Sequence, residues 1–241
     1  MNRKRIGLYS TLAFLVWAWA VWHPVHSRSI QLVLAISFAA MAVGSLLLLP
    51  KQARKGALFG GAILIAAFGF SLAFAKRDHD EKALRMQFLS DLEAQRGRTY
   101  VWGGEGFAGV DCSGLPRRAF RFACLKRGAL ELNPYLWRLA LESWLFDASA
   151  SAMKEGYRGA TTPLSLSAKA ITSLDHQSIE PGDLAVTSNG VHLLTYLGDG
   201  RWIQADPGAL EVIVEDAANS TNAWMNTPVE IVRWSALEEA P

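Results

Sequence analysis

The first 75 residues contain no aspartate or glutamate, although the whole chain of 241 residues carries 22 acidic residues. This segment holds three apolar runs, at residues 6–22, 30–49 and 57–75, and its seven basic residues lie only between and beside them. A helix needs about 20 apolar residues to cross the hydrocarbon core of a bilayer. Because a surface helix of a soluble protein has a charged face, we predict that residues 1–75 form three transmembrane helices in a lipid bilayer.

The first apolar run also has features of a cleaved signal peptide. Basic residues at 3–5 precede it, and Ala18-x-Ala20 is a weak cleavage pattern. We favour a retained helix, because the residues that flank this pattern are bulky.

The basic residues indicate how these helices are oriented. Three lie at 3–5 and three at 51–55, whereas the loop between the first two runs carries only Arg28. Cytoplasmic loops are enriched in Lys and Arg. The N-terminus and the second loop are therefore predicted to be cytoplasmic. Three crossings then place the chain from residue 76 onward on the outer, non-cytoplasmic side of the membrane, and cleavage of the first helix would not change that side.

The rest of the chain suits one globular domain. Residues 76–97 are predicted to form a charged linker that runs into a helix, and residues 98–241 form the domain itself. Of the charged residues, 17 basic and all 22 acidic ones lie after residue 75, which gives a net charge of −5 and argues against nucleic-acid binding. The Asp-His-Asp-Glu run at 78–81 has no second ligand cluster at zinc-like spacing, so we expect no metal and no cofactor.

A cysteine lies where an extended, glycine-rich run meets a helical pattern. Tyr-x-Trp-Gly-Gly occupies residues 100–104 and Asp-Cys-Ser-Gly-Leu occupies 111–115. Cys112 is thus predicted at a helix N-terminus, where free N–H groups and the helix dipole favour a thiolate, and it is a candidate nucleophile. Cys124 lies about 18 Å further along the same helix, too far for a disulfide, and is expected to be a small buried residue.

A base and an orienting group are predicted on one β-hairpin. The alternation around His192 indicates a strand, Gly-Asp-Gly at 198–200 indicates the turn, and residues 201–205 return antiparallel. His192 and Gln204 are equally far from the middle of this hairpin, so both side chains point to one face and Gln204 can bond the imidazole. Nucleophile, base and orienting group form the pattern of a thiol triad. His176, in a polar loop, is a weaker candidate for the base.

These motifs resemble those of the NlpC/P60 cysteine peptidases of bacterial cell walls. With Pro-Gly-Asp-Leu at 181–184 and His-x-x-x-Tyr-x-Gly at 192–198, four elements occur in family order over roughly residues 91–205. The resemblance implies a papain-like α+β fold, in which the nucleophile helix packs on an antiparallel sheet. It also implies hydrolysis of an amide bond in peptidoglycan stem peptides, usually beside a D-glutamyl linkage.

Roles carry over from the family to the matching positions. Cys112 is then the nucleophile, His192 the base and Gln204 the orienting residue. The residues that match the substrate groove are Tyr100, Trp102, Asp111 and Ser113. Together with the predicted topology, the resemblance places the domain on the periplasmic side of the bacterial inner membrane, with peptidoglycan stem peptides as its partner.

The chain departs from the family pattern in three places. Gln204 stands where histidine is most common, and a neutral amide cannot stabilise an imidazolium with a full charge. Pro116 follows Leu115, which a first helical turn tolerates. About 80 residues separate Cys112 from His192, which implies an insertion.

The insertion, at about 130–160, has a strong helix start at Asn133-Pro134 and continues as an apolar helix to about residue 148. This helix fits three interpretations: a core helix of the domain, a flap over the groove, or a segment resting on the outer leaflet. Residues 156–162 are predicted to form a mobile loop, and strands are predicted at 210–214 and 229–234.

Two other functions compete with the hydrolase. The apolar insertion and the membrane helices fit a thiol acyltransferase or an amidase that acts on a lipid-linked substrate. A non-catalytic wall-binding module is the third possibility, and the intact Cys, His and Gln positions argue against it.

Overall fold

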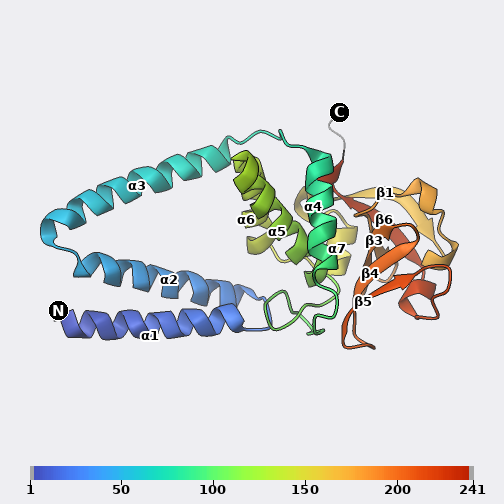
Figure 1. The fold of residues 1–241 in the computed structure, drawn as a ribbon, viewed down its shortest axis with the longest axis horizontal. Coiled ribbons are helices and arrows are strands. Elements are labelled where there is room, and N and C mark those ends of the chain that lie inside the picture. The colour runs from blue at the N-terminus through green and yellow to red at the C-terminus, as the bar shows by residue number, and fades with distance from the viewer. Residues whose placement is uncertain (1–2, 239–241) are drawn as a thin grey trace.

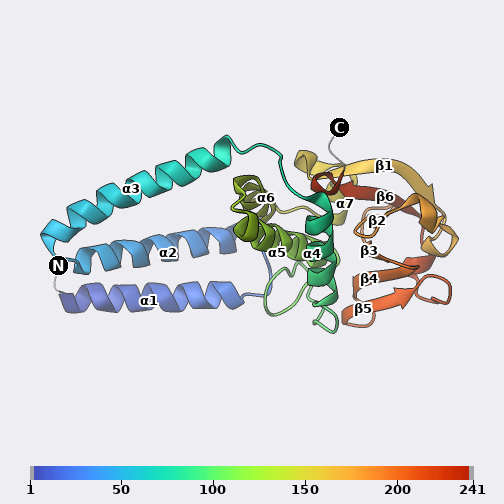
Figure 2. The same ribbon diagram turned by 45° about the horizontal axis from the view of Figure 1, so that its top comes forward.

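Three long helices form the N-terminal part of the computed structural model, which describes residues 3–238. They are α1 (Arg3–Trp22), α2 (Arg28–Leu48) and α3 (Lys51–Ala73), and each is long and apolar enough to cross a membrane. The predicted start of α3 at residue 57 is wrong, because the helix takes in the basic residues 51–55 as its first turns. Helices α1 and α2 lie side by side, whereas α3 meets α2 only near their connection and diverges from it (Figures 1 and 2).

The remaining chain is a helical layer on one six-stranded sheet. Its helices are α4 (Glu81–Glu93), α5 (Gly114–Glu131), α6 (Pro134–Leu145) and the short α7 (Ala150–Lys154). Its strands are β1 (Thr161–Ala168), β2 (Leu184–Thr187), β3 (Leu193–Gly198), β4 (Arg201–Asp206), β5 (Glu211–Asp216) and β6 (Val229–Trp234). All pairings are antiparallel, in the order β1-β6-β2-β3-β4-β5, which confirms the predicted α+β class.

The sheet is buried on both faces. One face packs against α4 and α5, where Phe88 and Phe120 meet Trp234. The other face lies beneath the loops around Ile171 and Met225. Because successive strand residues point to opposite faces, burial of both faces leaves every residue of β3 buried. This central position holds the start of β3, and with it His192, firmly in place.

The edge strand β1 was not predicted. Residues 156–162, expected to form a mobile loop, instead contain a short turn of 3-10 helix, and β1 begins at Thr161. Pro163 lies within β1, and an edge strand tolerates proline because one side of its backbone needs no partner. A bulge between Pro163 and Leu166 adjusts its register with β6.

Helix α6 joins the domain to the N-terminal helices. Its predicted start is confirmed, since Asn133 Oδ1 accepts a hydrogen bond from the Tyr135 N–H at 2.9 Å and proline occupies the first turn. Leu136 and Ala140 are buried in the main core, as expected of a core helix. On another side Arg138 donates a hydrogen bond to the Leu72 carbonyl of α3 at 3.3 Å.

Candidate active site

Asp111 stabilises the start of α5, the helix that follows Cys112. Its Oδ1 accepts hydrogen bonds from the Gly114 N–H (2.6 Å) and the Ser113 hydroxyl (3.0 Å), and its Oδ2 accepts one from the Gly103 N–H (2.9 Å). A side chain at position 114 would lie 2.1 Å from the Gly104 carbonyl oxygen, so only glycine fits there. These contacts explain why the two glycine-containing motifs occur together.

Cys112 lies two residues before α5 and against the strand that follows His192. Its Sγ is 3.8 Å from the Val191 carbonyl and also receives the backbone N–H of Leu193, so the thiol contacts both neighbours of His192. Burial and the nearby Asp111 raise the pKa of the thiol to about 12, more than the backbone N–H groups lower it. The predicted preference for a thiolate is therefore wrong for the resting site, where the thiol keeps its proton at neutral pH.

His192 is held by a chain of hydrogen bonds. Its Nε2 lies 2.6 Å from Gln204 Oε1, and Gln204 Nε2 donates to Glu215 Oε2 at 2.7 Å. Because the carboxylate takes the amide N–H, the amide oxygen faces the ring, so Nε2 carries the imidazole proton and Nδ1 is the free base. Burial lowers the pKa of His192 to about 4, and Gln204 and Asp206 oppose this shift only in part.

The hairpin brings His192 and Gln204 together in a slightly different register from the predicted one. Strands β3 and β4 pair Tyr196 with Trp202, and a bulge follows before Gly198. When this pairing is continued along both strands, Gln204 lies diagonally across from His192 and not directly opposite it. The offset is two residues, so both side chains still share one face, as predicted.

Two residues that support the imidazole were missed at the sequence level. Glu215 on β5 accepts hydrogen bonds from Ser220 (2.9 Å) and Asn222 (3.1 Å) besides that from Gln204. The Trp224 ring stacks on the imidazole at 4.1 Å between centroids. The parity of the β4–β5 hairpin could have revealed Glu215, whereas Trp224 begins a short 3-10 helix (Trp224–Asn226) that no sequence pattern indicated.

A cleft of about 270 Å³ opens beside Cys112. All four residues predicted to bind substrate line it: Tyr100, Trp102, Asp111 and Ser113. Desolvation raises the pKa of Tyr100 to about 12, so its hydroxyl remains a donor, and Trp102 is 81% exposed at the rim. His26, from the loop between α1 and α2, also lines the cleft, although no sequence pattern pointed to it.

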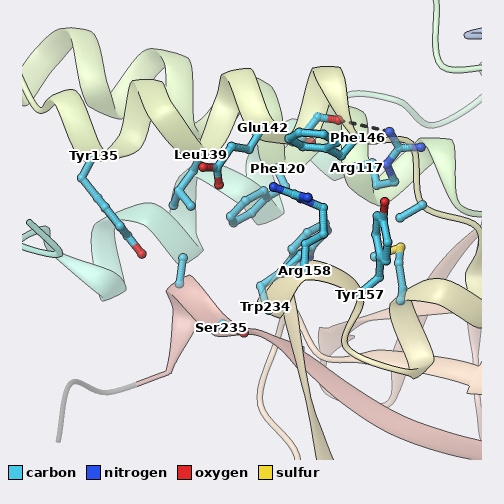
Figure 3. Close-up of a pocket in the computed structure, with 16 residues that line it drawn as sticks. Arg117, Phe120, Tyr135, Leu139, Glu142, Phe146, Tyr157, Arg158, Trp234 and Ser235 are labelled. Carbon is cyan, nitrogen blue, oxygen red and sulfur yellow. Dashed lines mark hydrogen bonds between the residues drawn. The ribbon is translucent and has the colours of Figure 1, made fainter. Parts of the chain in front are cut away.

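A buried ion-pair cluster supports the cleft from behind. Glu105 pairs with Arg117 at 3.1 Å and with Arg121 at 2.7 Å, and all three side chains are buried. Arg117 also borders a second cavity of about 100 Å³ between α5, α6, the turn at residues 157–160 and the end of β6, where Arg158 lies over the Phe146 ring (Figure 3). That cavity does not include Cys112.

Other candidate groups are engaged elsewhere. His176 accepts a hydrogen bond from the Trp202 indole at 3.1 Å and packs against the Tyr196 and Trp202 rings, so its ring nitrogen is already occupied. Cys112 and Cys124 are both free, and Cys124 is fully buried. Within residues 3–238, no group of three or more His, Cys, Asp or Glu side chains is arranged to hold a metal ion.

The part of the chain that holds this site matches a known protein family. Residues 97–233 match the model of the NlpC/P60 family, which is more than half of the chain. The chain belongs to the NlpC/P60 family. In this NlpC/P60 protein the Pro-Gly-Asp-Leu motif is structural, because the fully buried Asp183 accepts two hydrogen bonds from Arg233, at 2.7 and 2.8 Å.

Solved structures of other family members are similar but distant. NlpC1 from Trichomonas vaginalis is 18% identical, with a TM-score of 0.42, over 67% of this chain and 46% of that one. The peptidoglycan hydrolase RipB from Mycobacterium tuberculosis is 22% identical, with a TM-score of 0.38, over 62% of this chain and 65% of that one. This NlpC/P60 chain thus matches less than two thirds of either protein. No curated protein matches it.

Proposed function

We propose that the protein is a membrane-anchored cysteine hydrolase that cleaves an amide bond in peptidoglycan stem peptides, as a D-glutamyl-type endopeptidase. Cys112 is the nucleophile, His192 the base and Gln204 the orienting residue. One observation carries the proposal: the Cys112 thiol contacts the backbone of Val191 and Leu193, the two neighbours of His192, and the Nε2 of His192 is held by Gln204. Family membership and the activity of the similar RipB, a peptidoglycan hydrolase, support the substrate class.

The neutral resting pair suits a general-base mechanism. His192 Nδ1 takes the thiol proton while Sγ forms a bond to the amide carbonyl carbon. The backbone N–H of Cys112 and the Tyr100 hydroxyl stabilise the resulting oxyanion. The imidazolium then protonates the leaving amine as the C–N bond breaks, and His192 finally activates a water molecule that releases the acyl group and restores the thiol.

Trp102, Asp111 and Ser113 complete the proposed substrate cleft. Asp111 is already bonded to the start of α5, so its main part is to hold the cleft walls together. The exposed ring of Trp102 offers an apolar surface at the rim.

We further propose that all three helices span the bacterial inner membrane, with the N-terminus in the cytoplasm and the catalytic domain in the periplasm. The basic residues at 3–5 and 51–55 support this orientation. It requires the α1–α2 loop and the catalytic domain to share one side of the membrane. A contact between the loop and the domain supports this requirement, since the His26 backbone N–H donates a hydrogen bond to the Gly103 carbonyl at 3.0 Å.

Soluble muropeptides test the activity. The full chain in lipid nanodiscs is incubated with purified disaccharide-peptides, beside a Cys112→Ala control, and the products are identified by mass spectrometry. New stem-peptide fragments that require the thiol are expected, and their masses identify the bond. An absence of fragments, while a thiol-reactive probe still labels Cys112, would contradict the endopeptidase and favour acyl transfer or amidase chemistry.

A further inference from the structure

The loop between α1 and α2 forms one wall of the cleft that contains Cys112. Val25 forms an isolated antiparallel bridge with Gly104, and His26 lines the cleft itself. Helix α1 ends at Trp22 and α2 begins at Arg28, so every loop residue is at most three residues from a membrane helix. Three extended residues span roughly 10 Å. The cleft therefore lies close to the level at which these helices leave the bilayer.

A hydrogen-bonded junction fixes α2 to the end of α6. His26 Nε2 lies 3.1 Å from the Trp144 carbonyl and 2.8 Å from Gln31 Nε2, and Gln31 donates to the same carbonyl. His26 is also 4.0 Å from Glu105. The junction thus joins the membrane hairpin, the insertion helix and the buried ion pairs behind the cleft.

An apolar groove of about 530 Å³ lies beside this junction. Its floor comes from α5 and α6, its wall from α3, and the apolar side chains that form it are Phe68, Leu72, Leu125, Trp137, Leu141 and Trp144. Figure 1 shows α2 and α3 diverging toward this region. Helix α3 has no buried residue, so the groove is continuous with a helix surface that is apolar and exposed.

We propose that the substrate is a stem peptide carried on a membrane lipid, whose apolar chain lies in this groove while the peptide enters the cleft at Cys112. Two features link the two sites. First, Arg121 lines the groove, and its ion-pair partner Glu105 lines the cleft. Second, Trp144 lines the groove, and its backbone carbonyl forms a hydrogen bond with His26, which lines the cleft. The groove and the cleft therefore lie next to each other, as a single ligand with an apolar tail and a peptide head requires.

The substrate class rests on the proposed function, and the level of the cleft supports it. A fully extended pentapeptide reaches only about 17 Å. A peptide that starts at the lipid head groups reaches a cleft beside the helix ends, and its lipid remains in the hydrocarbon next to the groove. A lipid-free peptide gains nothing from the groove.

The test compares two substrates with the full chain in nanodiscs. One is a disaccharide-pentapeptide on a polyprenyl diphosphate, incorporated in the disc, and the other is the same disaccharide-pentapeptide without the lipid. We expect kcat/KM to be at least about tenfold higher for the lipid-linked form. Leu141→Gln places a polar group in the groove and should lower this ratio about tenfold, because one apolar side chain contributes that order of binding.

A matched control separates the groove from simple co-localisation in the disc. Leu130 is on α5, 74% exposed and outside the groove, so Leu130→Gln should leave the ratio unchanged. Equal kcat/KM for both substrates, or a ratio that Leu141→Gln does not lower, would overturn the inference.

A binding measurement tests the lipid-binding role of the groove separately from the catalytic activity. The Cys112→Ala protein is cross-linked to a photoactivatable analogue of the lipid-linked peptide and digested. Label on α3, α5 and α6 peptides that line the groove supports it, and label elsewhere contradicts it. If the wild-type protein cleaves neither substrate, the proposed function fails, and the cross-link still decides where the lipid chain binds.

Discussion

Glu215 should speed the reaction through its charge, although it does not touch the imidazole. Its Oε2 bonds the Gln204 amide, which in turn bonds His192. The two hydrogen bonds of 2.7 and 2.6 Å, plus the amide between them, place this oxygen within roughly 8 Å of the ring nitrogen. With an effective dielectric of about 20, a charge at that distance stabilises an imidazolium by about 2 kcal/mol.

Glu215→Gln removes the charge and keeps the hydrogen bonds. The new amide oxygen can accept from Gln204 and Asn222, and the new amide nitrogen can donate to the Ser220 hydroxyl. Because Glu215 is half-buried, solvent screens part of the interaction, and we expect a loss of about 1–2 kcal/mol. That corresponds to a decrease of roughly 5- to 30-fold in kcat/KM on a fluorogenic stem peptide.

The pH profile distinguishes this effect from structural damage. A negative charge favours the imidazolium, so its loss should shift the acidic limb of kcat/KM to lower pH by about 0.7 to 1.5 units. Glu215→Ala also frees the Gln204 amide to turn and should cost about a further fivefold. If Glu215→Gln stays within twofold of the wild type at every pH, the imidazole does not sense this charge and the reasoning fails.

Four further predictions follow from the site and its support. Gln204→Ala should lower kcat/KM 10- to 1000-fold while thiol labelling of Cys112 persists, and an unchanged rate would remove the amide from the mechanism. Alkylation of Cys112 should accelerate about tenfold per pH unit from pH 7 to 10, because its pKa is about 12; a plateau near pH 6 would instead indicate a resting ion pair. The pKa of His192 is lowered from 6.5 to about 4, so between these pH values the unfolded state binds a proton that the folded state does not. The free energy of unfolding should therefore fall by about 3 kcal/mol as the pH drops from 6.5 to 4. Thermal unfolding measures this loss, which His192→Gln should abolish. Glu105→Ala should cost about 3–5 kcal/mol of stability because it leaves buried arginines short of a partner, whereas Glu93→Ala, which breaks an exposed pair, should change the unfolding temperature little.

Local patterns were sufficient to predict much of the site. Composition predicted the three apolar helices, and strand parity predicted that His192 and Gln204 share a face. Asn133 predicted the start of α6 because capping depends on neighbouring residues only.

What could not be predicted depends on contacts between distant segments. The charge state of Cys112 follows from tertiary burial, which outweighs the helix N-terminus that the motif indicates. Strand β1 forms only because β6 offers it an edge. His26 lies in a five-residue loop with no pattern, and its place beside the cleft arises from contacts with residues 77 or more positions away.

The divergence of α2 and α3 gives the catalytic domain two separate points of attachment. One is the loop that carries His26, and the other is the link from α3 into α4 (Figure 2). A domain on a single flexible tether would sample many heights and tilts above a bilayer. Where these helices span a bilayer, a domain held at two points keeps a fixed height and tilt above it, so the helices themselves set how far the cleft lies from the lipid surface.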